Sequence, residues 1–254
     1  MSAPIIILYD IPRRDEFSEK AWSPNVFKVR YALNIKGIPY TTVWKEYPEV
    51  EPICKELGIP PTGTKPDGSD FYTFPAIQDT RTKTFVGDSY AVIKYLDSAF
   101  PDTPPLIQPG SDALHAAFTQ RVFRAVGFPI FKICAGRLSR QLNPPSEAYF
   151  KVAKAQQLGT DDFDSLNTAE SFEALEKGLA DIKSLLDANT DAKTVSVTGM
   201  PGTYTFSDVM LAAAANWLRT VAGEDSEDWK KAVALHDGFL GKFMENYKHF
   251  QQIV

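Results

Sequence analysis

A serine, a proline and an asparagine stand together at the start of a predicted helix, in the segment Trp22-Ser23-Pro24-Asn25. Serine is a preferred N-cap residue, and proline fits the first helical turn. The same geometry points the Ser23 hydroxyl and free backbone N–H groups beyond the helix end, where they stabilise an anion such as a thiolate. Two interpretations fit this segment: Ser23 is a helix cap and nothing more, or it is a cap that also serves a reaction.

A second unusual feature is Pro75, which lies inside the strand-like pattern of residues 73–77. Proline cannot donate a hydrogen bond to a sheet, so it suits an edge, a bulge or a cis peptide bond. A cis Phe74–Pro75 bond turns the N–H and C=O of Phe74 outward, where both groups can pair with an extended peptide. The alternative is a plain edge strand. We expect the cis bond, because proline is poorly suited to an ordinary strand.

The third feature is the pair Asp88-Ser89 at the start of an amphipathic pattern. Asp88 is a credible N-cap, and apolar residues recur at helical spacing from Val92 to Ala99. The backbone N–H groups and hydroxyl at Ser89 then form a second helix N-terminus that can hold a carboxylate. Each of the three features is common alone, but their occurrence in this order in the first part of the chain is much more specific.

Together these residues resemble the glutathione transferase superfamily. The run from Ser23 to Asn34 is most similar to serine-type, etherase-like enzymes, the fungal A class related to bacterial lignin β-etherases. The resemblance implies an α/β thioredoxin-like N-terminal domain followed by an all-α C-terminal helical domain, which is the glutathione transferase fold. Within that fold Ser23 corresponds to the catalytic residue, Pro75 to the cis-proline, and Asp88-Ser89 to the acid-serine pair that opens the third helix.

The resemblance also implies a glutathione transferase with glutathione as cosubstrate. The γ-glutamyl carboxylate of glutathione would meet Ser89 with Asp88 beside it, and its cysteinyl backbone would pair with Phe74. The sulfur would face Ser23, with Asn25 near. The activated thiolate would then attack hydrophobic or aromatic electrophiles, aryl ethers among them.

Two alternative functions stay open at this point. One is a ligandin-type, non-catalytic carrier of aromatic or polyphenolic compounds, which would need the same pocket. The other is a protein-interaction module that kept the fold without the activity, although the intact Ser23, Pro75 and Asp88-Ser89 argue against it. Disulfide-reductase chemistry is not expected, because a serine hydroxyl cannot form a mixed disulfide. The cysteines, Cys54 and Cys134, are 80 residues apart and are expected to be buried or half-buried thiols.

The periodicity of residues 1–100 predicts a thioredoxin-like order of strands and helices. The first strand, helix and second strand imply a right-handed parallel crossover, and the last two strands are antiparallel because a short turn joins them. The expected strands are 5–9, 40–44, 74–79 and 83–87, and the expected helices are 23–36, 49–57 and 88–99, with a loop at 59–70.

Residues 101–110 are rich in proline, cannot continue a helix, and mark a linker between two domains. Residues 111–254 are then almost entirely helical in pattern. Thr205 and Asp208 have the spacing of a capping box at the start of one of these helices. The expected helices are 111–141 with a kink near Gly127, then 146–158, 168–188, 206–222 and 226–249.

Four aromatic residues, Phe118, Phe123, Phe128 and Phe131, lie on the first helix of the second domain, with Arg121 among them. Core packing between helices is one interpretation. The other, which we adopt, is that Phe118, Arg121 and Phe128 line a hydrophobic pocket facing the first domain. The segment 12–22 is a candidate second wall of that pocket, or its charged residues 13–16 are only a solvated surface.

Composition is that of a globular protein: 44% of the 254 residues are hydrophobic and 23% are charged. That length fits one small and one larger domain. The net charge of −5 argues against a nucleic-acid partner. The apolar run at 5–9 is far short of the ~20 residues that span a membrane, and it lacks a basic leader. We therefore expect a cytoplasmic protein without a membrane partner. No histidine pair has metal-ligand spacing, so no metal site is expected; the resemblance favours a homodimer.

Overall fold

A four-stranded mixed sheet forms the centre of the first half of the molecule. The computed structural model describes residues 5–65 and 67–254. The sheet has the strand order β2-β1-β5-β6, with β1 parallel to β2 and the other two pairs antiparallel. The predicted crossover and the predicted antiparallel pair are thus confirmed. The strands are β1 (Ile6–Asp10), β2 (Tyr40–Trp44), β5 (Ala76–Asp79) and β6 (Thr84–Gly87).

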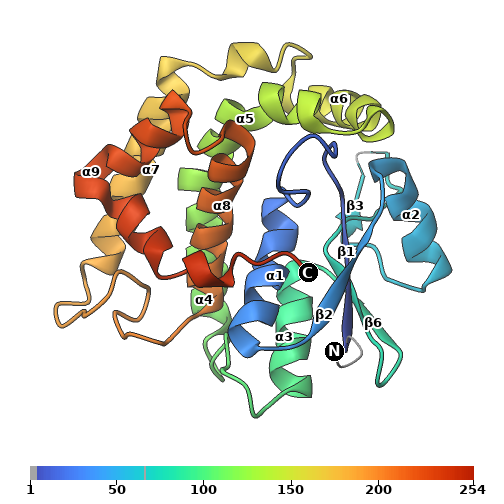
Figure 1. The fold of residues 1–254 in the computed structure, drawn as a ribbon, viewed down its shortest axis with the longest axis horizontal. Coiled ribbons are helices and arrows are strands. Elements are labelled where there is room, and N and C mark those ends of the chain that lie inside the picture. The colour runs from blue at the N-terminus through green and yellow to red at the C-terminus, as the bar shows by residue number, and fades with distance from the viewer. Residues whose placement is uncertain (1–4, 66) are drawn as a thin grey trace.

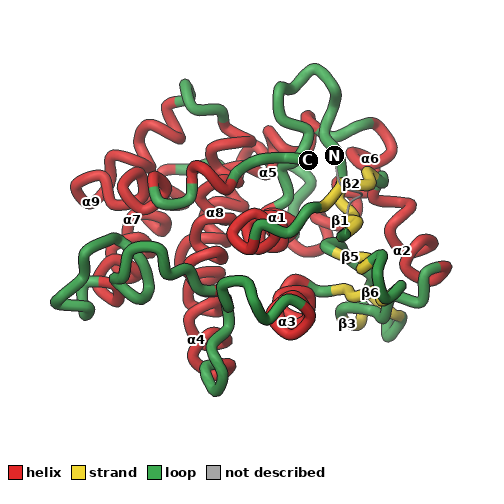
Figure 2. Tube along the Cα trace, turned by 60° about the horizontal axis from the view of Figure 1, so that its bottom comes forward, coloured by secondary structure: helices red, strands yellow, loops and turns green. Residues whose placement is uncertain are grey.

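Helices cover both faces of this sheet. Figures 1 and 2 show α1 (Pro24–Lys36) and α3 (Ser89–Ala99) on the face toward the second half of the chain, and α2 (Tyr47–Glu56) on the other side. The predicted loop at 59–70 also contains two short strands, β3 (Gly63–Thr64) and β4 (Asp70–Phe71), which pair with each other. Two-residue strands are too short to leave a periodic signal in a sequence.

The described second half of the chain is helical, as expected. Together with the thioredoxin-like sheet, this gives the predicted fold class. The segment 101–110 lies between α3 and the first of these helices. The elements are α4 (Asp112–Val122), η1 (Phe123–Gly127), α5 (Phe128–Gln141), α6 (Pro144–Leu158), η2 (Asp164–Leu166), α7 (Ala169–Leu186), α8 (Phe206–Ala222), α9 (Glu227–Glu245) and η3 (Lys248–Phe250).

Two predicted helices need correction. The expected helix 111–141 contains a π-helical turn, η1, placed just before Pro129. A π turn adds one residue to the helix, so side chains beyond it face in directions that a continuous α-helix would not give. The expected helix 226–249 is interrupted at Leu235–Gly238, where His236 and Asp237 have positive φ. Gly238, also at positive φ, favours this break because glycine adopts that conformation without steric cost.

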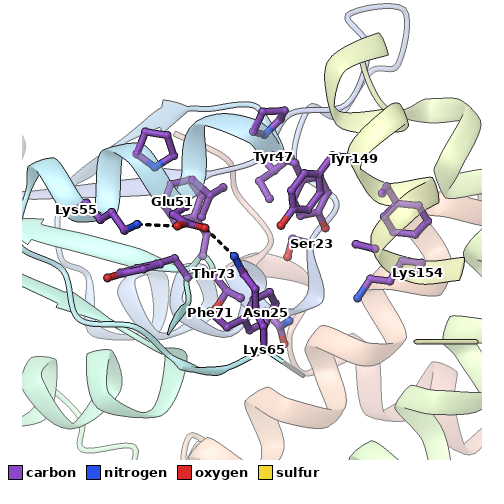
Figure 3. A pocket seen from close by; sticks show the side chains of 18 residues that line it. Ser23, Asn25, Tyr47, Glu51, Lys55, Lys65, Phe71, Thr73, Tyr149 and Lys154 are labelled. Atoms are coloured by element: carbon purple, nitrogen blue, oxygen red, sulfur yellow. Dashed lines mark hydrogen bonds and ion pairs between the residues drawn. The ribbon is translucent and has the colours of Figure 1, made fainter. Parts of the chain in front are cut away.

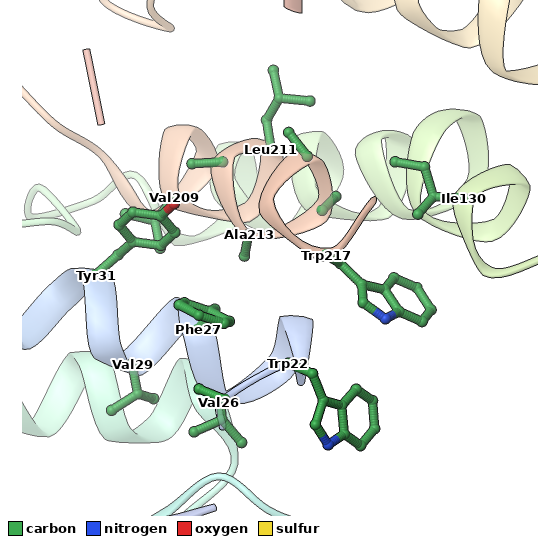
Figure 4. Close-up of a cluster of buried hydrophobic side chains, with 14 of the residues drawn as sticks. Trp22, Val26, Phe27, Val29, Tyr31, Ile130, Val209, Leu211, Ala213 and Trp217 are labelled. Carbon is green, nitrogen blue, oxygen red and sulfur yellow. The ribbon is translucent and has the colours of Figure 1, made fainter. Parts of the chain in front are cut away.

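The two halves of the chain pack through α1 and α8. Phe27 and Tyr31 of α1 are buried against α8, where Ala213 presents a small side chain toward α1 (Figure 4). Small residues on one helix allow the backbones to approach, so the large side chains of the other fill the space between them. Trp22, just before α1, and Trp217 of α8 lie at the same end of this interface (Figure 4).

Two local predictions about polar and thiol groups are confirmed. Thr205 and Asp208 form the capping box of α8, and the Asp208 carboxylate also accepts from the backbone N–H of Val197 at 2.7 Å. Cys54 and Cys134 are both free and fully buried.

Candidate active site

Ser23 lies directly before α1, at the end of the segment that connects β1 to α1. Its Oγ accepts a hydrogen bond from the N–H of Val26 at 3.5 Å, and its side chain is 7% exposed. A buried ion pair, Arg30 Nη2 to Asp10 Oδ2 at 2.9 Å, ties α1 to the end of β1. The sequence therefore positions Ser23 through a helix cap and a cross-link between the two elements that flank it.

Ser23 and Asn25 line the first of two adjoining cavities, which we call cavity A. Cavity A has a volume of about 440 Å³ and runs between α2, the segment before Pro75, and α6. Figure 3 shows Ser23 and Asn25 below the rings of Tyr47 and Tyr149, which stack with centroids 5.2 Å apart. Lys55 and Lys65 reach the other end of cavity A. Both pair with Glu51, at 2.7 and 2.9 Å.

Cavity B adjoins cavity A and is more aromatic. It has a volume of about 250 Å³ and lies between the start of α1 and the helices α5, α6 and α8. Its walls include Trp22, Phe123, Phe131, Phe150 and Trp217. The two cavities share five lining residues: Ser23, Asn25, Tyr47, Phe150 and Lys154. A group held at Ser23 in cavity A can therefore face an apolar ligand in cavity B.

The backbone of Phe74 is available for pairing. The Phe74–Pro75 peptide bond is cis, as predicted. Among the described residues, no backbone hydrogen bond uses the N–H or the C=O of Phe74. Phe74 lines cavity A, while the sheet pairing of β5 begins two residues later at Ala76. An extended peptide in cavity A would find both groups of Phe74 free.

Asp88 and Ser89 open α3 as predicted. Asp88, at φ 70°, accepts from the N–H groups of Tyr90 and Ala91 at 2.9 and 3.1 Å. The Ser89 hydroxyl makes no hydrogen bond within the described chain and lines cavity C, a depression of about 340 Å³. Lys28, Phe123 and Met210 line both cavity C and cavity B. Ser89 thus lines neither of the cavities that Ser23 lines, but these three shared residues connect cavity C to cavity B.

Two family models match the chain in succession. One, described as Glutathione S-transferase, N-terminal domain, matches residues 22–99, and the other, Glutathione S-transferase, C-terminal domain, matches residues 113–250. The chain belongs to the glutathione S-transferase family.

Solved structures and one curated relative agree with this assignment to the transferase family. Glutathione transferase GSTFuA3 from Phanerochaete chrysosporium is 44% identical, with a TM-score of 0.94 and 99% of each chain covered. CsGST63524 of Ceriporiopsis subvermispora, solved in complex with glutathione, is 34% identical, with a TM-score of 0.92 over 98% of this chain and 99% of that chain. The predicted resemblance to the fungal A class is confirmed.

The curated relative is the Glutathione S-transferase-like protein ustS of Aspergillus flavus. It is 38% identical over 104 residues, which make up 39% of this chain. The matched segment spans only 36% of the length of ustS.

Of the residues considered for the hydrophobic pocket, Phe123 and Phe131 line cavity B of this transferase, whereas Phe118, Arg121 and Phe128 do not. Phe118 is half-buried and packs against the core. Arg121 is exposed and pairs with Asp181 of α7, in a separate surface depression. Phe128 is 36% exposed and lies beside Phe131 instead of in the cavity wall. The π turn η1 shifts the helical phase of the residues beyond it, Phe128 and Phe131. Phe118 and Arg121 lie before it on α4, so the turn does not account for their positions.

Sequence reasoning missed most of the cavity walls, which come from distant segments. Of the predicted second wall, residues 12–22, Trp22 lines cavity B. Arg13 is 4% exposed and donates to Gln141 Oε1 and to the C=O of Thr220, at 3.0 and 2.9 Å. Arg13 is therefore a buried side chain that links the segment before α1 to α5 and α8, and it is not a solvated surface charge. Tyr47 and Lys154 belong to no recognisable sequence motif. Only their position beside Ser23 in the structure identifies them as cavity residues.

Within the described part of the chain, no group of three or more His, Cys, Asp or Glu side chains is arranged to hold a metal ion. The same residues include no helix with both the length and the hydropathy needed to cross a membrane.

Proposed function

We propose that this transferase activates the thiol of glutathione at Ser23 for attack on hydrophobic or aromatic electrophiles. One observation carries the proposal: Ser23 lines both cavity A, which contains the free backbone of Phe74, and the aromatic cavity B. A tripeptide thiol and an apolar partner can therefore meet at one hydroxyl.

The contacts suggest how glutathione would lie. Its cysteinyl backbone would pair with Phe74, and its γ-glutamyl carboxylate would meet the N–H groups and free hydroxyl of Ser89, with Asp88 near its ammonium. The glycyl carboxylate would extend toward Lys55 and Lys65 in cavity A. Each end of glutathione then meets groups of complementary charge or hydrogen-bonding character.

Ser23 is suited to stabilise a thiolate in this arrangement. The cap uses a lone pair of Oγ to accept from Val26, so the hydroxyl proton stays available to donate to sulfur. The N-terminus of α1 adds its partial positive charge, and the exposed amide of Asn25 can donate as well. The thiolate then forms a carbon–sulfur bond while the leaving group departs with its electron pair. In a β-aryl ether the bond between the β-carbon and oxygen would break, and the aryloxy group would leave as a phenolate.

The glutathione-bound structure of CsGST63524, at 34% identity, supports the choice of thiol. The test is calorimetric titration with glutathione, followed by conjugation assays on a panel that includes a halonitrobenzene, an isothiocyanate and a β-aryl ether. Binding with turnover of at least one electrophile is the expected result. Absence of glutathione binding would contradict the proposal.

A second candidate function is a non-catalytic carrier of aromatic or polyphenolic compounds. The observation that favours it is the aromatic lining of cavity B, which can hold a flat ring without any reaction. Phe131 and Trp217 stack there at 5.7 Å with their planes 23° apart. Tight binding of aromatic ligands with no turnover of any electrophile would favour the carrier over the enzyme.

Two properties stay predictions from the sequence: a homodimer and a cytoplasmic location. Light scattering coupled to gel filtration tests the first, and fractionation of the source cells tests the second.

A further inference from the structure

We propose that cavity B selects aromatic ligands that carry a negative charge, such as a carboxylate, a sulfonate or an acidic phenolate, and that Lys28 receives this charge with Lys154 as a second receptor. The inference rests on the proposed function in one respect, that cavity B is the site of the aromatic partner. It goes further by naming the chemical class of that partner.

Lys28 is an unusual lysine because it is nearly buried and has no partner. Its side chain is 9% exposed, and it makes no hydrogen bond or ion pair with any residue in the ranges 5–65 and 67–254. It lies about one turn into α1 and lines cavity B together with Ser23. A buried ammonium without a counter-ion is costly, so the free protein offers an unsatisfied donor to whatever enters the cavity.

Lys154 places a second positive charge on the opposite wall, on α6. Its Nζ donates to Gln157 Oε1 at 2.8 Å and lies 5.5 Å from the ring centroid of Phe131. Neither contact neutralises its charge. Figure 3 shows its ammonium directed toward the space beside Ser23. Burial lowers the pKa of Lys154 and brings that of Lys28 to about 8, so Lys28 remains largely charged at neutral pH.

The charge of cavity B is not balanced by its own lining. None of its described lining residues is an aspartate or a glutamate. Asp88 is the charged group that acts on Lys28, but it lies outside that lining and burial has the larger effect on the pKa. Cavity A differs, because Glu51 pairs with both of its far lysines, Lys55 and Lys65. Cavity B therefore combines aromatic walls with an uncompensated positive charge.

An anionic aromatic ligand satisfies both features at once. Its ring would lie among Trp22, Phe131 and Trp217, and its anion would accept hydrogen bonds from Lys28 and Lys154. A neutral ligand of the same shape would cover the Lys28 ammonium further without pairing it. The expected preference for the anion is therefore set by Lys28 more than by the aromatic walls.

The test compares two dyes that differ by one sulfonate group, anilinonaphthalene sulfonate and the neutral N-phenylnaphthylamine. Each is titrated against the full-length protein without glutathione, so the result does not depend on thiol chemistry. The Lys28→Met variant should bind the sulfonate about ten-fold more weakly and the neutral dye with nearly the same affinity. Lys28→Arg should restore most of the loss, and Lys154→Met should show a smaller loss of the same kind.

Lys151→Met is the matched control, because Lys151 is exposed on the same helix as Lys154 and pairs with Glu147 at 2.6 Å. This variant removes one positive charge outside cavity B and should leave the affinity for both dyes unchanged. Thermal unfolding of each variant checks that it is folded. Equal losses for both dyes, or no loss of sulfonate affinity in Lys28→Met, would overturn the proposal.

One other anion could reach Lys28, the γ-glutamyl carboxylate of glutathione, because Lys28 also lines cavity C with Ser89. Repeating the titrations with saturating glutathione separates the two sources. A sulfonate preference that persists supports an anionic aromatic partner. A preference that disappears would assign Lys28 to glutathione and overturn the inference, whereas failure of the proposed function would instead appear as absent glutathione binding.

Discussion

The Oγ of Ser23 and the backbone nitrogen of Val26 lie 3.5 Å apart, which makes Ser23 the N-cap of α1. The same residue lines both cavity A and cavity B. The long distance leaves this cap weaker than one at the usual separation. A substitution at Ser23 therefore changes two things, the stability of the helix start and the environment of any group in the cavities. Measurements of stability and of the thiol pKa separate these two effects.

Loss of the cap alone should be modest. Ser23→Ala should lower the free energy of unfolding by about 1 kcal/mol or less. The matched control is Ser226→Ala, which removes the cap of α9, where Oγ accepts from Trp229 N at 3.1 Å. Urea denaturation of both variants gives the comparison. A much larger loss in Ser23→Ala would mean that its hydroxyl has a structural role beyond the cap.

Ser89 should contribute directly to glutathione affinity. Ser89→Ala removes a hydroxyl that has no other partner in the described chain, so the loss falls on the ligand. A hydrogen bond to a charged group is worth about 1.5–3 kcal/mol, which corresponds to a ten- to hundred-fold weaker Kd for glutathione. Calorimetric titration with glutathione measures the Kd of Ser89→Ala, with Ser226→Ala as the control. An unchanged Kd would remove Ser89 from the site.

The capping box of α8 should matter for stability and not for chemistry. Asp208 is fully buried and accepts from Val197 N, Thr205 N and Thr205 Oγ1 at 2.7, 2.9 and 2.7 Å. Asp208→Ala leaves these donors without a partner, at about 1–3 kcal/mol each, so the loss should exceed that of the exposed Asp225→Ala by several kcal/mol. Equal midpoints of thermal unfolding in the two variants would refute this role.

Lys28 should give the stability a distinctive pH dependence. Its pKa is lowered to about 8 by burial, whereas an unfolded lysine titrates near ~10.4. Between these values the unfolded chain binds more protons, so this residue makes stability rise as pH increases. The Lys28→Met variant lacks this rise in the free energy of unfolding with pH. The variant should therefore be more stable than the wild type below pH ~8, with the difference shrinking toward pH ~10. A difference that does not vary with pH would contradict the lowered pKa.

Local signals predicted the first half of the fold and much of its site. Ser23, Pro75 and Asp88 each combine a residue type with a helix start or strand position, so the sequence alone indicated the cap, the cis bond and the second helix start. The walls of the aromatic cavity were predicted only in part: Phe123 and Phe131 line it, whereas Phe118 and Phe128 do not. The π turn η1 changes which residues of α5 face the cavity, and helical periodicity does not reveal a π turn.

Contacts between distant segments were also beyond reach. Arg13 looked like a surface charge, yet its guanidinium binds groups on α5 and α8. Lys28 followed the ordinary pattern of a helix surface, but in the fold it lines cavities together with Phe123 of η1 and Met210 of α8. Both cases depend on tertiary structure, which propensity and spacing do not encode.

The thiol pKa of bound glutathione tests the central claim most directly. Thiolate absorbance in the ultraviolet is followed against pH in complexes of the wild type and of Ser23→Ala. We expect a pKa below the free value of ~8.5 in the wild type and a value about one to two units higher in the variant. Conjugation at neutral pH should fall in the variant and recover partly as pH rises. The same thiol pKa and pH profile in both proteins would contradict the account, and would leave activation to Asn25 or the backbone N–H groups of α1.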